Sequence, residues 1–188
     1  IIDNRNKILL LANAPHPDVG AIKSALKDNP DFELTIRYIT DLDVNVKDFD
    51  LIILHQLPSL QNKATTVLSE IEKNSVPVLY IIGTATSLQA FNSLGTGLEI
   101  AGMSNKTDDA SPTPNTSFLA FDPGVDMNTF FRSLSPLRVN FGEYRFTGDA
   151  KVFLYQSING VKTSKPLIAF IDQSKAKIGF ITGEGLWR

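Results

Sequence analysis

The residues best suited to chemistry in this sequence of 188 residues are its two histidines, His16 and His55. Imidazole changes charge near neutral pH and also binds metals, so a histidine can act as a general base, a proton shuttle or a metal ligand. The sequence contains no cysteine, which excludes a thiolate zinc site, a disulfide framework and a cysteine nucleophile. The available chemistry therefore depends on imidazole, hydroxyl and carboxylate groups.

Both histidines belong to a set of polar residues that follow apolar, strand-like runs. In an open parallel sheet, ligands bind beyond the carboxyl ends of the strands, where such residues gather. We therefore expect a candidate ligand-binding rim made of Asn13, His16, His55, Gln56, Thr84 and Ser87.

The elements that must position this rim follow from hydrophobic patterning in the first half of the chain. Three continuous apolar runs and one alternating run predict buried strands, and apolar residues spaced by three and four predict helices between them. The predicted strands span residues 7–13, 32–39, 50–55 and 76–82. Asp18 can cap the first helix. This alternation predicts an α/β fold, namely a three-layer, doubly wound, mostly parallel sheet.

The second half of the chain has a different pattern. Residues 95–115 are rich in Gly, Ser, Thr, Asp and Pro, which predicts a long surface loop. Strand-like runs at 151–157, 166–172 and 177–182, separated by short turns, predict an antiparallel C-terminal extension of the sheet. No linker or repeat divides the sequence, so we expect a single domain over residues 1–188.

Composition limits the partners. The chain has 18 basic and 20 acidic residues, a balance without the basic surface that nucleic acid requires. No apolar run is long enough to span a bilayer, so the chain itself is expected to be soluble. Its first residue is Ile1 and it stops directly after a strand-like run, which suggests a piece excised from a longer protein.

One short motif suggests metal chemistry. His16, Pro17 and Asp18 resemble the His-Pro-Asp-Asp opening of zinc-dependent sugar-amide deacetylases, in which a histidine and the second aspartate hold the metal. Val19 stands in place of that second aspartate here. A catalytic zinc needs three protein ligands, and His55 is the only other imidazole. We therefore expect no metal and no cofactor.

A longer resemblance covers most of the chain. Residues 50–58, with the sequence DLIILHQLP, and residues 77–84, with the sequence PVLYIIGT, resemble the oxyanion strand and the nucleophile strand of class I glutamine amidotransferase-like domains. The resemblance implies a flavodoxin-like fold. Ile82, or Gly83 in a shifted register, occupies the place of the nucleophilic cysteine, so glutaminase activity is excluded.

The C-terminal sequence extends this resemblance. The run from Pro166 to Phe170 and the final Gly-Glu184-Gly-Leu-Trp187-Arg188 resemble the closing hairpin of amidotransferase-like domains within bacterial membrane proteins. In those proteins the hairpin precedes a transmembrane helix. The resemblance implies a membrane-anchored parent protein in the cell envelope, on an undetermined side of the membrane.

These observations favour a non-catalytic binding or assembly module whose partner is another protein or another domain of the same chain. One alternative is a hydrolase in which His55 activates the hydroxyl of Thr84 or Ser87. Another is a small-molecule sensor that binds its ligand at the rim. No acidic residue is recognisable as the group that orients His55, although Asp41 or Glu99 could approach it in space.

Overall fold

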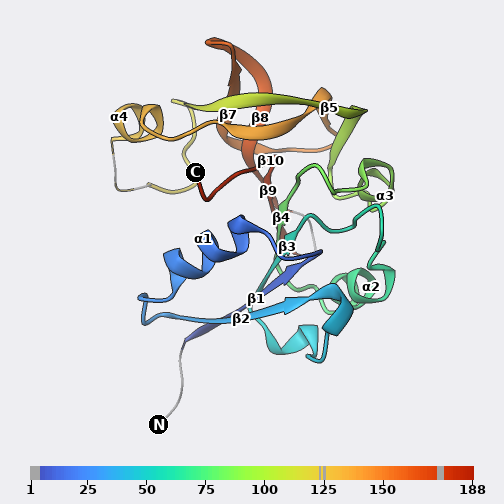
Figure 1. The fold of residues 1–188 in the computed structure, drawn as a ribbon. Coiled ribbons are helices and arrows are strands. Elements are labelled where there is room, and N and C mark those ends of the chain that lie inside the picture. The colour runs from blue at the N-terminus through green and yellow to red at the C-terminus, as the bar shows by residue number, and fades with distance from the viewer. Residues whose placement is uncertain (1–4, 123, 125, 173–175) are drawn as a thin grey trace.

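The computed structural model describes residues 5–122, 124, 126–172 and 176–188, and its strands form one ten-stranded sheet (Figure 1). The order across the sheet is β10-β6-β5-β7-β8-β9-β4-β3-β1-β2. The strands are β1 (Asn6–Ala12), β2 (Phe32–Tyr38), β3 (Leu51–His55), β4 (Val78–Ile81), β5 (Leu98–Pro114), β6 (Leu137–Phe146), β7 (Lys151–Ile158), β8 (Val161–Asp172), β9 (Lys177–Ile181) and β10 (Gly183–Glu184).

The helices are short and lie between the strands. They are α1 (Pro17–Leu26), α2 (Thr65–Lys73), α3 (Leu88–Asn92) and α4 (Met127–Arg132), with single 3₁₀ turns η1 (Ile39–Asp41) and η2 (Val46–Asp48). Among the described residues, none of these helices has the length and apolar character needed to cross a membrane.

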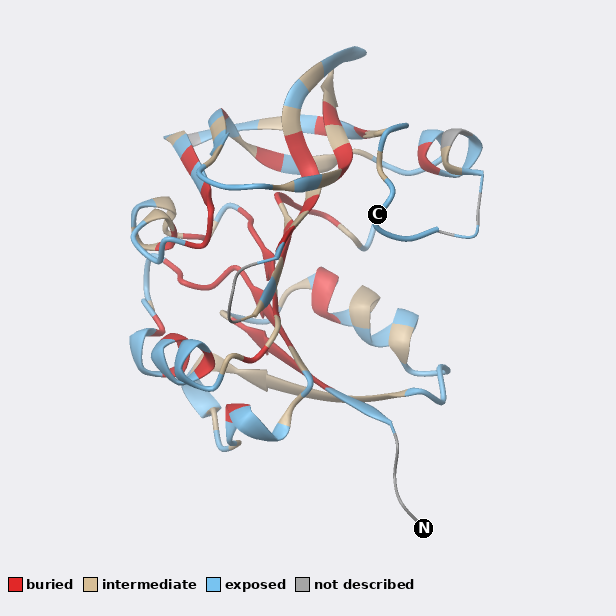
Figure 2. Ribbon diagram, turned by 180° about the vertical axis from the view of Figure 1, so that it is seen from behind, coloured by how far each residue is buried: buried red, intermediate tan, exposed pale blue. Residues whose placement is uncertain are grey.

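Half of the sheet is parallel, because β2, β1, β3, β4 and β9 all run in the same direction. Alternate residues of β1 enter different cores, as the two-residue period of a strand requires. Leu9 and Leu11 pack with α2 and α3, whereas Ile8 and Leu10 pack with α1. Figure 2 shows the buried residues concentrated along these central strands, while the edge strand β2 is only partly buried.

The rest of the sheet is antiparallel: β8 pairs with β9 at the boundary, and β7, β5, β6 and β10 follow in that order. It has its own apolar cluster, to which Phe131 of α4 and Phe153 of β7 both contribute. Phe118 and Phe121, from the turn after β5, add aromatic contacts with ring centroids 4.9 Å apart. The antiparallel half therefore has an apolar cluster of its own, separate from the two clusters that cover the faces of the parallel half.

The predicted fold class is wrong. The sheet is a large mixed one with an antiparallel half, and not a doubly wound, mostly parallel, flavodoxin-like sheet in three layers. The main error concerns the predicted loop at 95–115, most of which forms the 17-residue strand β5. The polar and glycine-rich composition of β5 hides the alternation of apolar and polar residues that marks a strand, because β5 lies largely at the surface. A bulge between Gly102 and Thr107 also interrupts its register with β6.

Two local predictions have different outcomes. The antiparallel meander of the last three strand-like runs is confirmed, because β7 pairs with β8 and β8 pairs with β9. The predicted cap of the first helix is wrong: the capping residue is His16, and Asp18 lies in the first turn. Pro17 explains this shift of two residues, since proline favours the first helical position and the residue before it, His16, is then the cap.

Candidate functional site at the strand ends

The carboxyl ends of three neighbouring strands meet at one place because of their register. Ala12 of β1 is paired with His55 of β3, and His55 is paired with Ile81 of β4. The backbone N–H of Asn13 donates to the His55 carbonyl at 3.0 Å. The residues that follow these strands therefore lie at the same edge of the sheet, as the sequence predicted.

His16 and Asp18 enter this edge from the start of α1. His16 adopts an extended backbone, and its Nδ1 accepts a hydrogen bond from the backbone N–H of Asp18 at 3.2 Å. Imidazole here takes the role that a Ser, Thr or Asn side chain usually has at a helix N-terminus. The Asp18 side chain is buried and lies next to His55 at the end of β3.

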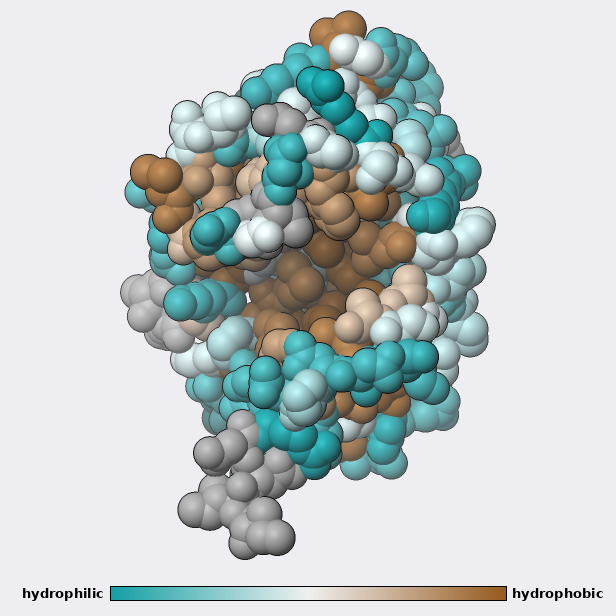
Figure 3. Space-filling model, turned by 90° about the vertical axis from the view of Figure 1, so that its left-hand side faces the viewer, coloured by the Kyte–Doolittle hydropathy of each residue, from teal (hydrophilic) through white to brown (hydrophobic). Residues whose placement is uncertain are grey.

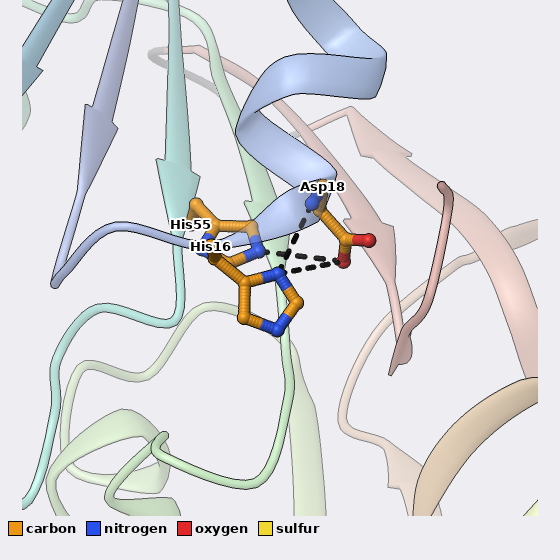
Figure 4. A group of neighbouring side chains, drawn as sticks. All are labelled: His16, Asp18 and His55. Atoms are coloured by element: carbon orange, nitrogen blue, oxygen red, sulfur yellow. Dashed lines mark hydrogen bonds and ion pairs between the residues drawn. The ribbon is translucent and has the colours of Figure 1, made fainter. Parts of the chain in front are cut away.

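His16, Asp18 and His55 form a compact cluster, and Figure 4 shows the two imidazole rings next to the Asp18 carboxylate. His55 Nε2 lies 3.4 Å from Asp18 Oδ2, and His16 Nδ1 lies 3.6 Å from the same oxygen. The two imidazole rings are 4.8 Å apart between centroids. The side chains of Asp18 and His55 are 0% and 1% exposed, whereas that of His16 is 26% exposed.

Asp18 is held by the last residues of the chain as well as by histidine. The backbone N–H of Gly185 donates to Oδ2 at 2.9 Å, and that of Trp187 donates to Oδ1 at 3.3 Å. Burial by itself raises the pKa of Asp18, but the hydrogen bonds from His55 and Gly185 and the nearby imidazoles outweigh it and lower the pKa. Asp18 is therefore a buried, ionised carboxylate that links α1 to the C-terminal segment.

A second buried carboxylate, Glu184, repeats this arrangement next to the first. Gln56 Nε2 donates to Glu184 Oε2 at 2.8 Å, and the Thr84 backbone N–H donates to the same oxygen at 2.9 Å. The other end of the Gln56 amide accepts from the Ala85 N–H at 2.7 Å. Gln56 has a φ of 55°, an uncommon conformation outside glycine that these contacts stabilise.

The structure thus brings five of the six predicted rim residues together around the two buried carboxylates, Asp18 and Glu184. His16 and His55 meet at Asp18, Gln56 and Thr84 meet at Glu184, and Asn13 joins through its backbone. Ser87 lies apart, since its hydroxyl accepts from the Ala90 N–H as the cap of α3.

Neither of the two predicted hydroxyls, those of Thr84 and Ser87, is positioned for activation by His55. The Thr84 hydroxyl donates to Glu184 at 3.1 Å, and the Ser87 hydroxyl is used in the helix cap. Among the described residues, the hydrogen-bond partner of His55 Nε2 is Asp18, and His55 Nδ1 is buried without a partner. The group that orients His55 is therefore Asp18, and neither Asp41 nor Glu99.

The position expected for a nucleophile is part of the core. Ile82 is buried among the apolar residues that pack against α2 and α3. Neither Ile82 nor Gly83 has a positive φ, so the chain forms no left-handed elbow at this point. A Cβ at Gly83 would overlap the side chains of Glu184 and Gln56, which explains the glycine there.

Sequence reasoning missed the two carboxylates that organise the site. The sequence predicts Asp18 as a helix cap and shows Glu184 only as part of a terminal motif. One signal was available for Glu184: it is a lone charge between two glycines, next to a strand-like run, where a close backbone approach is expected. Their pairing with residues more than 100 positions away has no local signal.

The chain matches no known family model and no curated protein. Among solved structures it resembles part of Agd3, described as a novel carbohydrate deacetylase, with a TM-score of 0.55 and 8% identity over 95% of this chain. A ThuA-like protein from Bacteroides uniformis aligns over 95% of this chain and 82% of its own, with a TM-score of 0.46 and 13% identity. The chain spans 29% of the Agd3 chain, and at this identity the likeness is one of fold alone.

Proposed function

We propose that this chain is a non-catalytic binding or assembly module in which the polar strand ends anchor the C-terminal segment. One observation carries the proposal: both oxygens of each buried carboxylate, Asp18 and Glu184, accept hydrogen bonds from donors within the chain. A catalytic carboxylate or imidazole must reach the substrate directly or through one water molecule. His55 is 1% exposed and contacts another side chain of the protein instead.

Apolar side chains elsewhere offer a surface for a partner. Figure 3 shows them gathered in a hollow on the side of the molecule where α1 lies. Leu119 and Phe121, in the turn between β5 and α4, are 93% and 47% exposed. An apolar hollow at the surface is typical of an interaction site. The partner in this proposal is another protein or another domain, in a membrane-anchored parent of the cell envelope.

Membership of the class I amidotransferase-like domains stays a prediction. It rests on the sequence motifs, and the observed sheet topology does not support it. At 8% identity, the likeness to part of a carbohydrate deacetylase concerns the fold alone. A hydrolase is the second candidate, because the Asp18–His55 pair resembles the orienter and base of a catalytic triad that has no nucleophile.

The test compares hydrolysis by the wild type and by His55→Gln on chromogenic esters, amides and N-acetylated saccharides. Glutamine keeps an amide donor for Asp18, so the variant retains the contact while losing the base. We expect no turnover by either protein above the buffer rate. Wild-type turnover that disappears in His55→Gln would favour the hydrolase and reject the module.

A further inference from the structure

Two imidazole nitrogens and one carboxylate oxygen converge at the strand ends, on side chains from two separate segments. His16 and Asp18 come from the start of α1, and His55 comes from the end of β3. Their ligand atoms all lie within 4.8 Å of one another. We propose that His16, Asp18 and His55 form a binding site for a divalent transition metal of the zinc class.

The distances suit a tetrahedral ion. Ligands about 2.1 Å from zinc lie roughly 3.4 Å apart from one another. Asp18 Oδ2 is already 3.4 Å from His55 Nε2 and 3.6 Å from His16 Nδ1. The two imidazole nitrogens must approach each other, and the His16 ring, whose side chain is 26% exposed, must give up its hydrogen bond from the Asp18 N–H.

Two ligand atoms at this point carry lone pairs and no proton. His16 Nδ1 is unprotonated, because it accepts a hydrogen bond from the Asp18 backbone N–H, and its single lone pair must leave that bond to bind a metal. It faces Asp18 Oδ2, which also carries lone pairs, at 3.6 Å with no hydrogen between them. A cation at this point replaces repulsion with attraction to both atoms.

The Asp18 carboxylate is hydrogen-bonded in the way that carboxylates bound to metals commonly are. Hydrogen bonds from Gly185 and Trp187 fix its orientation, as outer-shell donors commonly do for ligand carboxylates. His55 would release the proton on Nε2 that now faces Asp18 and take one on Nδ1, which has no partner among the described residues. The cost of that unpaired N–H opposes binding and limits the affinity.

The donor set and the burial define the ion and its role. Imidazole nitrogen with one carboxylate selects zinc, cobalt, nickel or copper over magnesium and calcium, which require oxygen ligands. Two of the three side chains are fully buried, so the site is nearly closed, as structural zinc sites are. The metal would clamp α1, β3 and, through Asp18, the C-terminal segment.

The experiment titrates Co²⁺ into the untagged, full chain and records the visible absorption bands of tetrahedral cobalt. Zn²⁺ is then added as competitor, and thermal unfolding is measured with and without Zn²⁺. The test variant is His16→Asn, because asparagine keeps a capping acceptor for Asp18 and removes the imidazole. The control is Asp28→Asn, which removes a carboxylate whose side chain is 86% exposed.

We expect one equivalent of Co²⁺ to bind wild type and Asp28→Asn alike, with displacement by Zn²⁺ and a rise in Tm. In His16→Asn the affinity should fall by more than about tenfold, since loss of even an outer-shell partner costs about 10–100-fold. The proposal fails if the wild type shows no saturable bands. It also fails if His16→Asn binds as tightly as the wild type, because the ion then lies elsewhere.

Discussion

Asp18 Oδ2 accepts a hydrogen bond from the backbone N–H of Gly185 at 2.9 Å, joining residues that are 167 positions apart. This contact ties the first helix to the end of the chain across the carboxyl ends of the central strands. Glu184, one residue earlier, makes the corresponding contact to Gln56 and Thr84. Two buried carboxylates therefore fix the C-terminal segment. Glu184 belongs to the segment itself, and Asp18 lies in α1 and accepts a hydrogen bond from the segment.

Asp18→Ala should lower the free energy of unfolding by about 3–5 kcal/mol. The substitution leaves the N–H groups of Gly185 and Trp187 and the buried imidazole of His55 without their acceptor, and buried polar groups without partners are costly. Urea denaturation followed by circular dichroism measures the difference. Asp28→Ala, at an exposed position, should change stability by less than about 0.5 kcal/mol. Equal effects of the two substitutions would refute an anchoring role for Asp18.

The same carboxylate predicts a dependence on pH in a buffer with a metal chelator. The pKa of Asp18 is lowered in the folded state from its ordinary value of 3.8. A lowered carboxyl pKa contributes stability that is complete above the unfolded pKa and is lost as the pH falls through the folded pKa. Wild-type stability should therefore fall more steeply than that of Asp18→Asn below about pH 4. Urea midpoints of both proteins between about pH 6 and about pH 3 measure this, and parallel curves would contradict it.

Gly83→Ala should destabilise the protein by about 1–3 kcal/mol, because the added methyl group displaces Glu184 and Gln56 from their hydrogen bonds. Gly20→Ala is the matched control. Its Cβ would meet no atom within 4 Å, and alanine is favoured over glycine inside α1 by about 0.5–1 kcal/mol. Thermal unfolding should shift in opposite directions for the two variants. If Gly83→Ala leaves the stability unchanged, the hydrogen bonds of Glu184 and Gln56 do not depend on the close approach of Gly83.

Ile82→Ala should cost about 2–5 kcal/mol, since it truncates a fully buried side chain in the main core. An exposed elbow residue would cost little. Leu60→Ala, at a position that is 70% exposed, serves as the control and should change stability by less than about 0.5 kcal/mol. The free energies of unfolding from urea titrations decide between a core residue and an accessible one at position 82.

Local patterns in the sequence were sufficient for the central strands, the three helices between them and the final meander. Apolar runs such as 50–55 and the spacing of Val67, Leu68 and Ile71 reflect burial that each segment achieves within one layer. The same patterns placed His16 and His55 at one edge, because parallel strands end on the same side. The composition shows that the chain has no cysteine to serve as the nucleophile of a glutaminase.

Tertiary structure alone decided the partners of those histidines and the architecture of the second half. The polar strand β5 gains its backbone hydrogen bonds from β6 and β7, which no local periodicity reports. Asp18 and Glu184 are charged residues, which the sequence alone predicts to lie at the surface. They are buried because distant backbone N–H groups converge on them, and that convergence exists only once the sheet has brought both ends of the chain together.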